Sequence, residues 1–557
     1  MCLHPRPVEP VPEPTARVAH AAFPNGNPYM RMRDEVGTIF EDEGFAELFP
    51  GRGKPAFSPW RLALVTIMQF SEDLSDRRAA DAVRARIDWK YALSLELDDP
   101  GFDASVLCEF RTRLLENGEE RLLFDALLER LREMGLVKAR GRQRTDSTHV
   151  LGATRALERL ELVGEAMRRA LNALAVAAPG WLRERARPEW AGRYAGPFDD
   201  RRLPKGKDER LKEAEEIGRD GFGLLDAVCS GESDAPAWLK ELPDLETLRV
   251  VWVQNYLLRP DGDVRFRDRD DGLPPAAKRL VSPTDPEVRA ARRGRIRWGG
   301  YKVHLTESCD EGAPRLVTHI GTDPAPVQDA EAVSPAHEAL RAKDLLPALH
   351  LVDGAYMEPR SLLEAHERFG VSLVGPAMRN TGWQAREGNG FDLSSFEFDW
   401  EKKEATCPEG KKGMSWKETV KDGRPAVRVK FSRKDCRPCP SRDLCIRRES
   451  SIAPFRDLTV RSREHYEAMR LVRELGLGPD RSRYSGREGI EGTIARAVRT
   501  CGARRARYVG LGKVHLQHLL GAAALNFLRV GEWLAGQQRG APPRSPFSKL
   551  MASPAAA

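Results

Sequence analysis

The sequence has no apolar run long enough to span a bilayer, so no membrane segment is expected. Its N-terminal segment, MCLHPRPVEPVPEPTARVAH, is rich in proline and lacks the apolar core that a signal peptide needs. Nine cysteines in a chain as long as 557 residues do not indicate the disulfide framework of a small secreted protein. Charged residues make up 31% and hydrophobic residues 41%, which is typical of a soluble globular protein. We therefore expect a cytoplasmic protein that does not enter a membrane.

Neither sign of charge dominates, because 90 Lys and Arg face 83 Asp and Glu for a net charge of +7. The arginines are nevertheless concentrated in three segments, residues 289–302, 461–473 and 496–508. One such segment alone would be an ordinary solvated surface. Three of them favour nucleic acid as a partner, since the guanidinium group is always charged and pairs with phosphate through two parallel hydrogen bonds.

The first part of the chain is predicted to be helical between two disordered ends. Residues 1–29 and 537–557 are rich in Pro and Ala and are expected to lack fixed structure. Residues 30–136 carry apolar side chains at three- and four-residue intervals, which predicts a helical domain. That domain fits either a DNA-binding unit related to the helix-turn-helix or an ordinary helical bundle.

A second domain is predicted over residues 137–536, where strand and helix patterns alternate. A strand with Asp146 near its end is followed by two strands, a helix, a strand ending at Asp353, a helix, a strand and a helix with Glu491. The closing stretch, residues 513–535, is mostly apolar and predicts a buried helix. This order predicts an α/β fold in which a mixed sheet is flanked by helices. Two large insertions interrupt it, a helical one at about 155–250 and a cysteine-containing one at about 380–455.

Three carboxylates are candidates for a single site. Asp146, Asp353 and Glu491 would repel one another if they met, unless a cation joined them. Their hard oxygen ligands suit Mg²⁺ or Mn²⁺, and two such ions about 3.5–4 Å apart support phosphoryl transfer. Each acid also has an ordinary explanation: Asp146 as a cap or turn residue, Asp353 as the start of a turn at Gly354, and Glu491 as one of many helical glutamates.

The segment YSGREGIEGT, residues 484–493, places Tyr484, Arg487 and Glu491 in the spacing Y-x2-R-x3-E. Arg487 and Glu491 are four residues apart and are therefore expected on one face of a helix. The pair either stabilises the helix as a simple ion pair, or it places the glutamate on a metal and the arginine on a DNA phosphate.

Together, the segments RTDSTHV, LVDGAYM and YSGREGIEGT resemble the three acidic motifs of bacterial insertion-sequence transposases of the DDE type. The resemblance covers nearly the whole chain. It implies a ribonuclease H-like catalytic core that follows a helical DNA-binding domain along the sequence. It also implies that Asp146, Asp353 and Glu491 bind Mg²⁺ or Mn²⁺. Tyr484 and Arg487 are then expected to handle DNA near the cleavage point.

One position departs from the family pattern. The signature often continues with a lysine that would fall on Val498, and Arg496 and Arg499 stand on either side of it. These two arginines are therefore candidates for the missing phosphate contact, although neither is in register.

The reaction that the resemblance implies has two stages. DNA is cut at the ends of the insertion sequence, and the freed 3′-hydroxyls attack target DNA by two-metal phosphoryl transfer, with a homodimer holding the paired ends. Two other functions stay open: a non-enzymatic, sequence-specific DNA-binding regulator derived from a transposase, and a metal-dependent nuclease that does not transfer strands.

Four of the nine cysteines, Cys407, Cys436, Cys439 and Cys445, crowd into the second insertion. Structural Zn²⁺ would suit a segment with little apolar content, because the ion contributes folding energy that a small core cannot. Zinc ribbons usually have two C-x2-C pairs, however, and only one is present here. Reduced thiols without a metal are the alternative.

Overall fold

The structure is a computed structural model that describes residues 2–198, 203–230, 234–268, 270–376, 383–384, 390–421, 424–446, 455–475, 484 and 486–536. The chain forms two compact units. Unit 1 consists of Met1–Lys138, Asp146–Val327 and Gly489–Ala557, and unit 2 consists of Ala139–Thr145 and Gln328–Glu488. Over these described ranges, no helix is long and apolar enough to cross a membrane.

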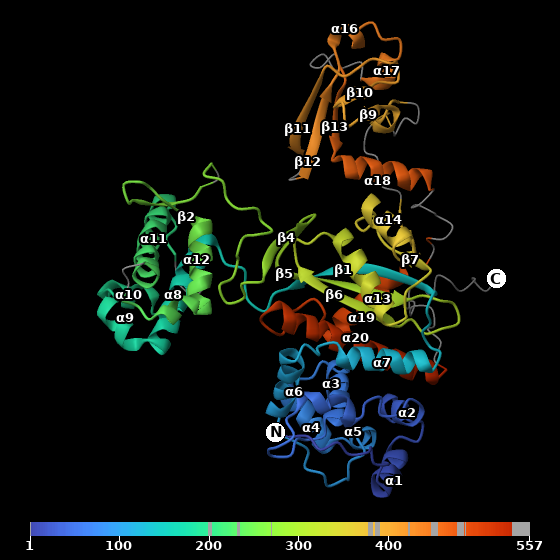
Figure 1. Cartoon of the computed structure of the whole chain (residues 1–557). Helices are drawn as coiled ribbons and strands as arrows, with labels where there is room; N and C mark the ends of the chain where they lie inside the picture. Colours follow the sequence, from blue (N-terminus) through green and yellow to red (C-terminus); the bar gives the residue numbers. More distant parts are fainter. Residues whose placement is uncertain are drawn as a thin grey trace, which may run out of the picture. The chain divides into compact units, whose positions relative to one another are not determined.

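The N-terminal part of unit 1 is helical, as predicted (Figure 1). Its apolar residues recur at helical spacing, and almost every side chain of α3 is buried. The elements are α1 (Glu13–Ala22), α2 (Pro28–Glu35), η1 (Asp42–Leu48), α3 (Pro59–Ser71), α4 (Asp76–Ala85), α5 (Ile87–Ala92), α6 (Ser105–Glu116) and α7 (Leu122–Glu133).

The structure differs from the predicted disorder over residues 1–29, because α1 lies within that range. Ala19 is fully buried and packs with Met30 and Tyr91 in a small apolar cluster. The hydroxyl of Thr15 donates a hydrogen bond of 2.8 Å to the carbonyl of Leu95. Two of the prolines that suggested disorder, Pro12 and Pro14, stand at the start of the helix, where a missing N–H costs nothing. The predicted tail, residues 537–557, lies outside the described residues.

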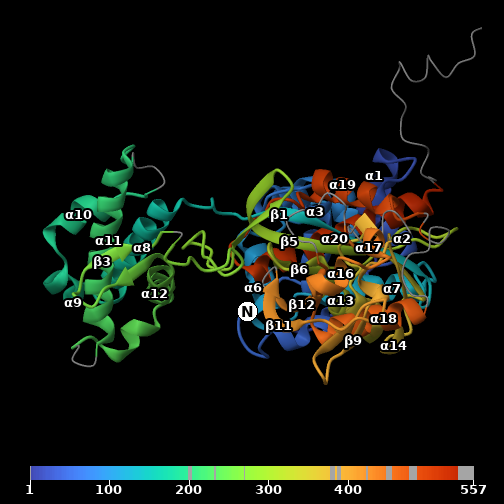
Figure 2. The same ribbon diagram turned by 90° about the horizontal axis from the view of Figure 1, so that it is seen from above.

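The first predicted insertion is a helical subdomain of unit 1 with its own core. Figures 1 and 2 show α8, α11 and α12 packed side by side. Gly221 allows this close approach, since a Cβ there would lie 2.6 Å from Nε1 of the buried Trp252. The elements are α8 (Arg159–Ala177), α9 (Pro179–Arg185), α10 (Pro188–Tyr194), α11 (Lys207–Cys229), η2 (Ala237–Glu241), α12 (Pro243–Asn255) and the antiparallel strands β2 (Tyr256–Leu258) and β3 (Val264–Phe266).

A mixed sheet carries the predicted acidic segments. In unit 1, β5 pairs antiparallel with β4 and β6, and it is also hydrogen-bonded to β1. The first residues of β1 belong to unit 2, where they pair in parallel with β7, which in turn pairs in parallel with β8. This sheet with its flanking helices is the predicted α/β fold and is consistent with a ribonuclease H-like core. The strands are β1 (Arg142–Leu151), β4 (Arg289–Arg293), β5 (Ile296–Ser308), β6 (Val317–Pro324), β7 (Leu349–Leu351) and β8 (Ser372–Val374).

Two C-terminal helices complete unit 1. The first, α19 (Gly489–Cys501), carries Glu491 in its first turn. The second, α20 (Leu511–Leu534), is buried over most of its length and packs against both β6 and α3 (Figure 1). The run of apolar residues in α20 predicted a buried helix, and the structure confirms it.

Unit 2 contains η3 (Asp329–Ala332), α13 (Val333–Ala342), α14 (Pro359–Glu367) and the cysteine-containing insertion. The insertion has a small core of its own that includes Phe396, Val429 and Phe431. Its elements are η4 (Leu393–Ser395), the hairpin β9 (Glu397–Asp399) and β10 (Glu404–Thr406), the antiparallel sheet β11 (Ser415–Lys421), β12 (Arg424–Lys430) and β13 (Asp457–Arg461), and helices α16 (Arg433–Cys436), α17 (Arg442–Cys445) and α18 (Arg463–Glu474).

Candidate functional site

Asp353 lies in a turn just beyond β7, in unit 2. The strand ends at Leu351, two residues earlier than the sequence predicted. The Oδ1 atom of Asp353 accepts a hydrogen bond of 2.5 Å from the backbone N–H of Ala355, and its side chain is 24% exposed. One carboxylate oxygen is thus fixed by the backbone, while the group as a whole still reaches solvent.

Arg487 is the cation beside this carboxylate. Its Nη2 atom lies 3.9 Å from Oδ2 of Asp353, which is close enough for attraction but too far for a hydrogen bond. The predicted helical pairing of Arg487 with Glu491 differs from the structure, because α19 begins only at Gly489 and Arg487 occupies the turn before it. The motif therefore spans a turn and a helix start, rather than one helical face.

The same turn is tied to β1 by a residue that the sequence did not single out. Arg144 is buried in β1 and donates a hydrogen bond to the carbonyl of Gly486. The backbone N–H of Arg487 in turn points to the carbonyl of Tyr484 at 3.4 Å. Tyr484 and Arg487 thus lie in one turn of unit 2. Arg144 could have been noticed in the sequence, because it is the first residue of the RTDSTHV segment that carries Asp146.

Asp146 and Glu491 both belong to unit 1. Asp146 lies within β1 rather than near its end, is 8% exposed, and accepts a hydrogen bond of 2.8 Å from the N–H of Ser147. Glu491 is exposed on the first turn of α19, where the helix dipole favours a negative charge.

The two arginines near the departure at Val498 have different surroundings. Arg496 forms a two-pronged ion pair with Glu532 of α20, at 2.9 and 2.5 Å. Arg499 is exposed and donates a hydrogen bond of 3.4 Å to the carbonyl of Ala495 in its own helix. Of the two, Arg499 is therefore the better placed to contact a phosphate.

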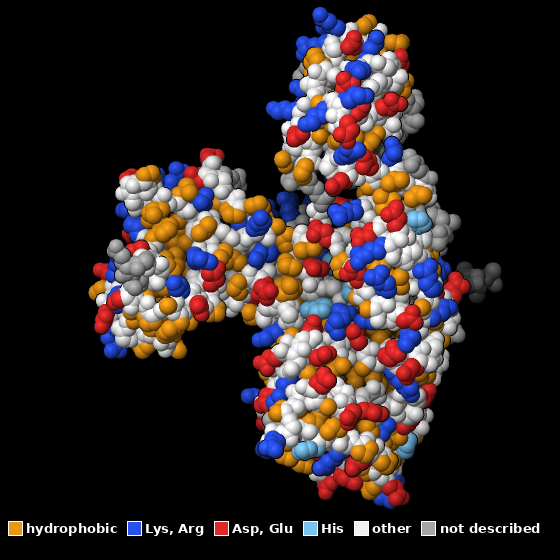
Figure 3. All heavy atoms as spheres, viewed as in Figure 1, with side chains coloured by type: hydrophobic (Ala, Val, Ile, Leu, Met, Phe, Trp, Pro, Cys, Tyr) orange, Lys and Arg blue, Asp and Glu red, His pale blue; other side chains and the backbone are white. Residues whose placement is uncertain are grey.

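The three arginine-rich segments also differ in their neighbours. On the face in Figure 3, basic and acidic side chains lie intermixed. In the second segment Arg463 pairs with Glu401 and Glu467, and in the third Arg507 pairs with Asp73. Part of the charge in these two segments is consequently balanced within the chain.

A buried chain of hydrogen bonds runs beneath Asp353 in unit 2. The hydroxyl of Thr145 lies 2.6 Å from Nε2 of His350 on β7, and Nδ1 of His350 lies 2.8 Å from Nε2 of His337 on α13. Burial lowers the pKa of His337 to about 4 and holds the pKa of His350 well below its usual value. Both rings are therefore neutral at pH 7. Their hydrogen bonds join β7, the strand that leads to Asp353, to β1 and α13 without adding a charge there.

The four cysteines of the insertion line one cavity of about 30 Å³. Cys407 stands in a tight turn in which its Sγ accepts a hydrogen bond of 3.3 Å from the N–H of Lys411. Burial raises the pKa of the Cys445 thiol to about 11. Cys436 and Cys439 reach the same cavity from the end of α16 and the loop after it.

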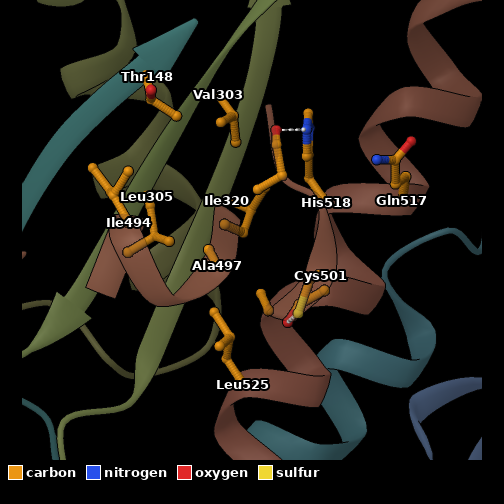
Figure 4. Close-up of a pocket in the computed structure, with 13 residues that line it drawn as sticks. Thr148, Val303, Leu305, Ile320, Ile494, Ala497, Cys501, Gln517, His518 and Leu525 are labelled. Atoms are coloured by element: carbon orange, nitrogen blue, oxygen red, sulfur yellow. Dashed lines mark hydrogen bonds between the residues drawn. The ribbon is translucent and has the colours of Figure 1, made fainter. Parts of the chain in front are cut away.

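A second small cavity lies behind α19 in unit 1 (Figure 4). Its volume is about 20 Å³, room for roughly one water molecule. Ile494, Leu305 and Leu525 make its walls apolar, and the nearby His518 and Cys501 bond to backbone carbonyls (Figure 4). Thr148 and Gln517 add polar side chains to the lining, but most of it is apolar, so the cavity is an imperfection in the core packing rather than a substrate site.

Across the described ranges, no three His, Cys, Asp or Glu side chains lie close enough together to hold a metal ion as they stand. The donor chemistry of Asp146, Asp353 and Glu491 nevertheless suits a hard divalent cation, because carboxylate oxygens are the ligands that Mg²⁺ and Mn²⁺ prefer. Asp353 fits this role best, since the only cation that the described residues place near its Oδ2 is the guanidinium of Arg487, 3.9 Å away.

Comparison with known protein families gives two matches. Residues 406–530 match a family described as Transposase DDE domain, and residues 17–113 match one described as Transposase domain (DUF772). The first segment contains Tyr484, Arg487 and Glu491, while the second lies in the N-terminal helices. No curated protein matches the sequence.

Proposed function

Because the chain belongs to the insertion-sequence transposases of the DDE type, we propose that it cuts DNA at the ends of an insertion sequence and joins the freed 3′-hydroxyls to target DNA. The observation that carries this proposal is the Transposase DDE domain match over residues 406–530, which contains the Tyr484, Arg487 and Glu491 signature. The substrates are then insertion-sequence ends and target DNA, and a homodimer on paired ends would suit such a reaction. We further propose that the chain works in the cytoplasm.

Asp146, Asp353 and Glu491 are the residues that we assign to Mg²⁺ or Mn²⁺. When bound, such ions neutralise phosphate charge and favour attack by an oxygen nucleophile. The chain itself orients Asp353 through the N–H of Ala355 and through the turn at the end of β7. Arg487, beside Asp353, is suited to bind a phosphate oxygen next to the acid, and Tyr484 in the same turn would contact the neighbouring backbone. Arg499, and less directly Arg496, would contact phosphates further from the acids.

The test is strand cleavage of a duplex carrying the cognate insertion-sequence end, with Mg²⁺ or Mn²⁺. Asp353→Ala is expected to lower the cleavage rate at least about a hundredfold, because the variant loses a ligand for the cation. The side chain is partly exposed, so alanine should not disrupt the fold of the turn. Asp226→Ala, which removes an exposed aspartate from α11, is the matched control and should cut like the wild type.

Equal cleavage by wild type and Asp353→Ala would refute the assignment of the acids. Tight, sequence-specific binding without cleavage under any metal condition would instead favour a DNA-binding regulator derived from a transposase. Cleavage without joining of pre-cut ends would favour a nuclease.

We also propose that Cys407, Cys436, Cys439 and Cys445 take up a structural zinc ion. The support is that all four line one small cavity, and that the backbone N–H of Lys411 already points at a sulfur, as is favourable for a thiolate ligand. Rotation of the thiol side chains must accompany binding, because no three of them are yet gathered around one point.

Purified protein is expected to contain about one zinc ion per chain by elemental analysis. Cys439→Ser should lose that zinc and lower the melting temperature of the insertion, whereas Cys229→Ser, at an exposed cysteine of α11, should retain it. Folded wild-type protein that stays free of zinc after incubation with the metal would rule out the site.

A further inference from the structure

The first arginine-rich segment forms a two-stranded ribbon at the edge of the sheet in unit 1. β4 and the start of β5 pair antiparallel, with Arg292 opposite Arg297 and Arg293 opposite Ile296 (Figure 1). Gly294, with φ of 59°, begins the two-residue turn that joins them. A short turn of this kind makes the ribbon a stiff projection whose side chains have fixed spacing.

The tip of this ribbon concentrates positive charge without an internal counterion. Arg292, Arg293, Arg295 and Arg297 are all exposed. Among the described residues, no carboxylate pairs with any of them, whereas Arg463 of the second segment and Arg507 of the third do pair with carboxylates. The one hydrogen bond from Arg292, of 2.8 Å, goes to the carbonyl of Gly294 in the turn itself.

This arrangement costs stability in the free protein. Residues directly opposite each other on paired strands are about 5 Å apart at Cβ, so Arg292 and Arg297 repel each other. All four guanidiniums lie within a segment short enough that solvent ions do not fully screen them from one another. Ile296, at the tip, is also 53% exposed. A polyanion would relieve the repulsion, and an exposed apolar tip suits contact with sugars and bases.

The root of the ribbon lies against the strand that carries Asp146. The ring of Trp298 on β5 lies beside that of His149 on β1, with centroids 5.6 Å apart and the planes tilted by 51°. The pKa of His149 is lowered by burial and by the nearby cations Arg504 and Arg293. Arg504 also donates a hydrogen bond of 2.8 Å to the hydroxyl of Thr148. Arg293 of the ribbon and Arg504 therefore both lie close to His149, three residues after Asp146 on β1.

We propose that this arginine ribbon, residues 289–297, binds the phosphate backbone of duplex DNA alongside the cleavage site. A two-stranded ribbon has the width of a DNA groove, and its arginines can reach phosphates on both sides. The proposal rests on the proposed function, because it takes DNA as the substrate. It adds a contact surface outside the acidic motifs and the N-terminal helices.

The test measures duplex binding by fluorescence anisotropy over a range of salt concentrations. The double variant Arg292→Gln/Arg297→Gln removes the opposed pair and about two phosphate contacts. The slope of log affinity against log salt concentration is expected to become less negative by about 2. The affinity near physiological salt should fall at least about tenfold. The melting temperature should stay the same or rise, since the substitution relieves repulsion, and this readout separates lost binding from lost folding.

A matched variant, Arg183→Gln/Lys240→Gln, removes two exposed cations from the helical subdomain and should leave the slope unchanged. The ribbon proposal is overturned if the Arg292/Arg297 variant binds duplex with the wild-type slope, or if structured RNA but not duplex competes for the ribbon. Cleavage assays on the same proteins keep the two proposals distinct. If the wild type binds duplex through the ribbon but never cuts it, the proposed cleavage and joining activity is refuted and the ribbon proposal stands.

Discussion

Arg529→Met is expected to lower the free energy of unfolding by about 3–5 kcal/mol, because it leaves the carboxylate of Glu307 buried without its cation. Nη1 of Arg529 on α20 donates a hydrogen bond of 2.9 Å to Glu307 on β5, and the two side chains are 3% and 0% exposed. The hydroxyl of Thr493 on α19 donates a further hydrogen bond of 2.7 Å to the same oxygen. Water cannot replace the lost guanidinium at this depth.

The measurement is urea or thermal unfolding of the full chain. Arg249→Met breaks an ion pair with Glu246 whose side chains are 62% and 52% exposed, and it should leave the melting temperature nearly unchanged. The double variant Glu307→Leu/Arg529→Met removes both charges and should recover much of the loss. If Arg529→Met changes the melting temperature as little as Arg249→Met does, the buried ion pair does not contribute the stability expected of it.

This network has a direct bearing on the proposed site. Thr493 stands two residues after Glu491, so its hydrogen bond to Glu307 fixes the first turn of α19 against the sheet. A helix end held only by apolar contacts could rotate by small amounts, whereas directional hydrogen bonds limit such movement. The position of Glu491 therefore depends on a charged group that the acidic motif does not contain.

The sequence predicted the order of the elements because each leaves a local pattern. Apolar spacing indicated the N-terminal helices and α20, and alternating or continuous apolar runs indicated β5, β6 and β7. Boundaries were less accurate: β1 continues past Asp146 to Leu151, and α19 starts after Arg487. How far a strand extends depends on whether a neighbouring strand provides backbone hydrogen-bond partners. That is a property of the whole fold and is not encoded in the segment alone.

Pairings between distant residues could not be predicted in the same way. Glu307 and Arg529 lie 222 positions apart, and each is an unremarkable charged residue in its own segment. Likewise, nothing near His350 in the sequence indicates that it joins Thr145 to His337. For the arginine segments, the charge is evident from the sequence, but the sequence does not show which arginines lie beside carboxylates, as Arg463 and Arg507 do, and which do not, as in the ribbon.

Gly299 and Gly300 show how a close backbone contact holds β1 against β5. The N–H of Gly152, just after β1, donates a hydrogen bond of 2.9 Å to the carbonyl of Gly299. A Cβ at Gly300 would lie 2.6 Å from the nitrogen of Gly152 and closer still to the carbonyl oxygen of Val150. Those atoms belong to the backbone and cannot turn aside as a flexible side chain would.

Gly300→Ala is therefore expected to destabilise the protein by about 3 kcal/mol or more, at the upper end of the cost of overpacking, because the end of β1 must move away from β5. Thermal unfolding and soluble yield measure the effect. Gly192→Ala, in α10, is the control: a Cβ there meets nothing within 4 Å, so alanine should stabilise the helix slightly. If soluble Gly300→Ala melts at the wild-type temperature, β1 does not approach β5 as closely as described. If it is less stable, DNA cleavage should fall with it, since β1 carries Asp146.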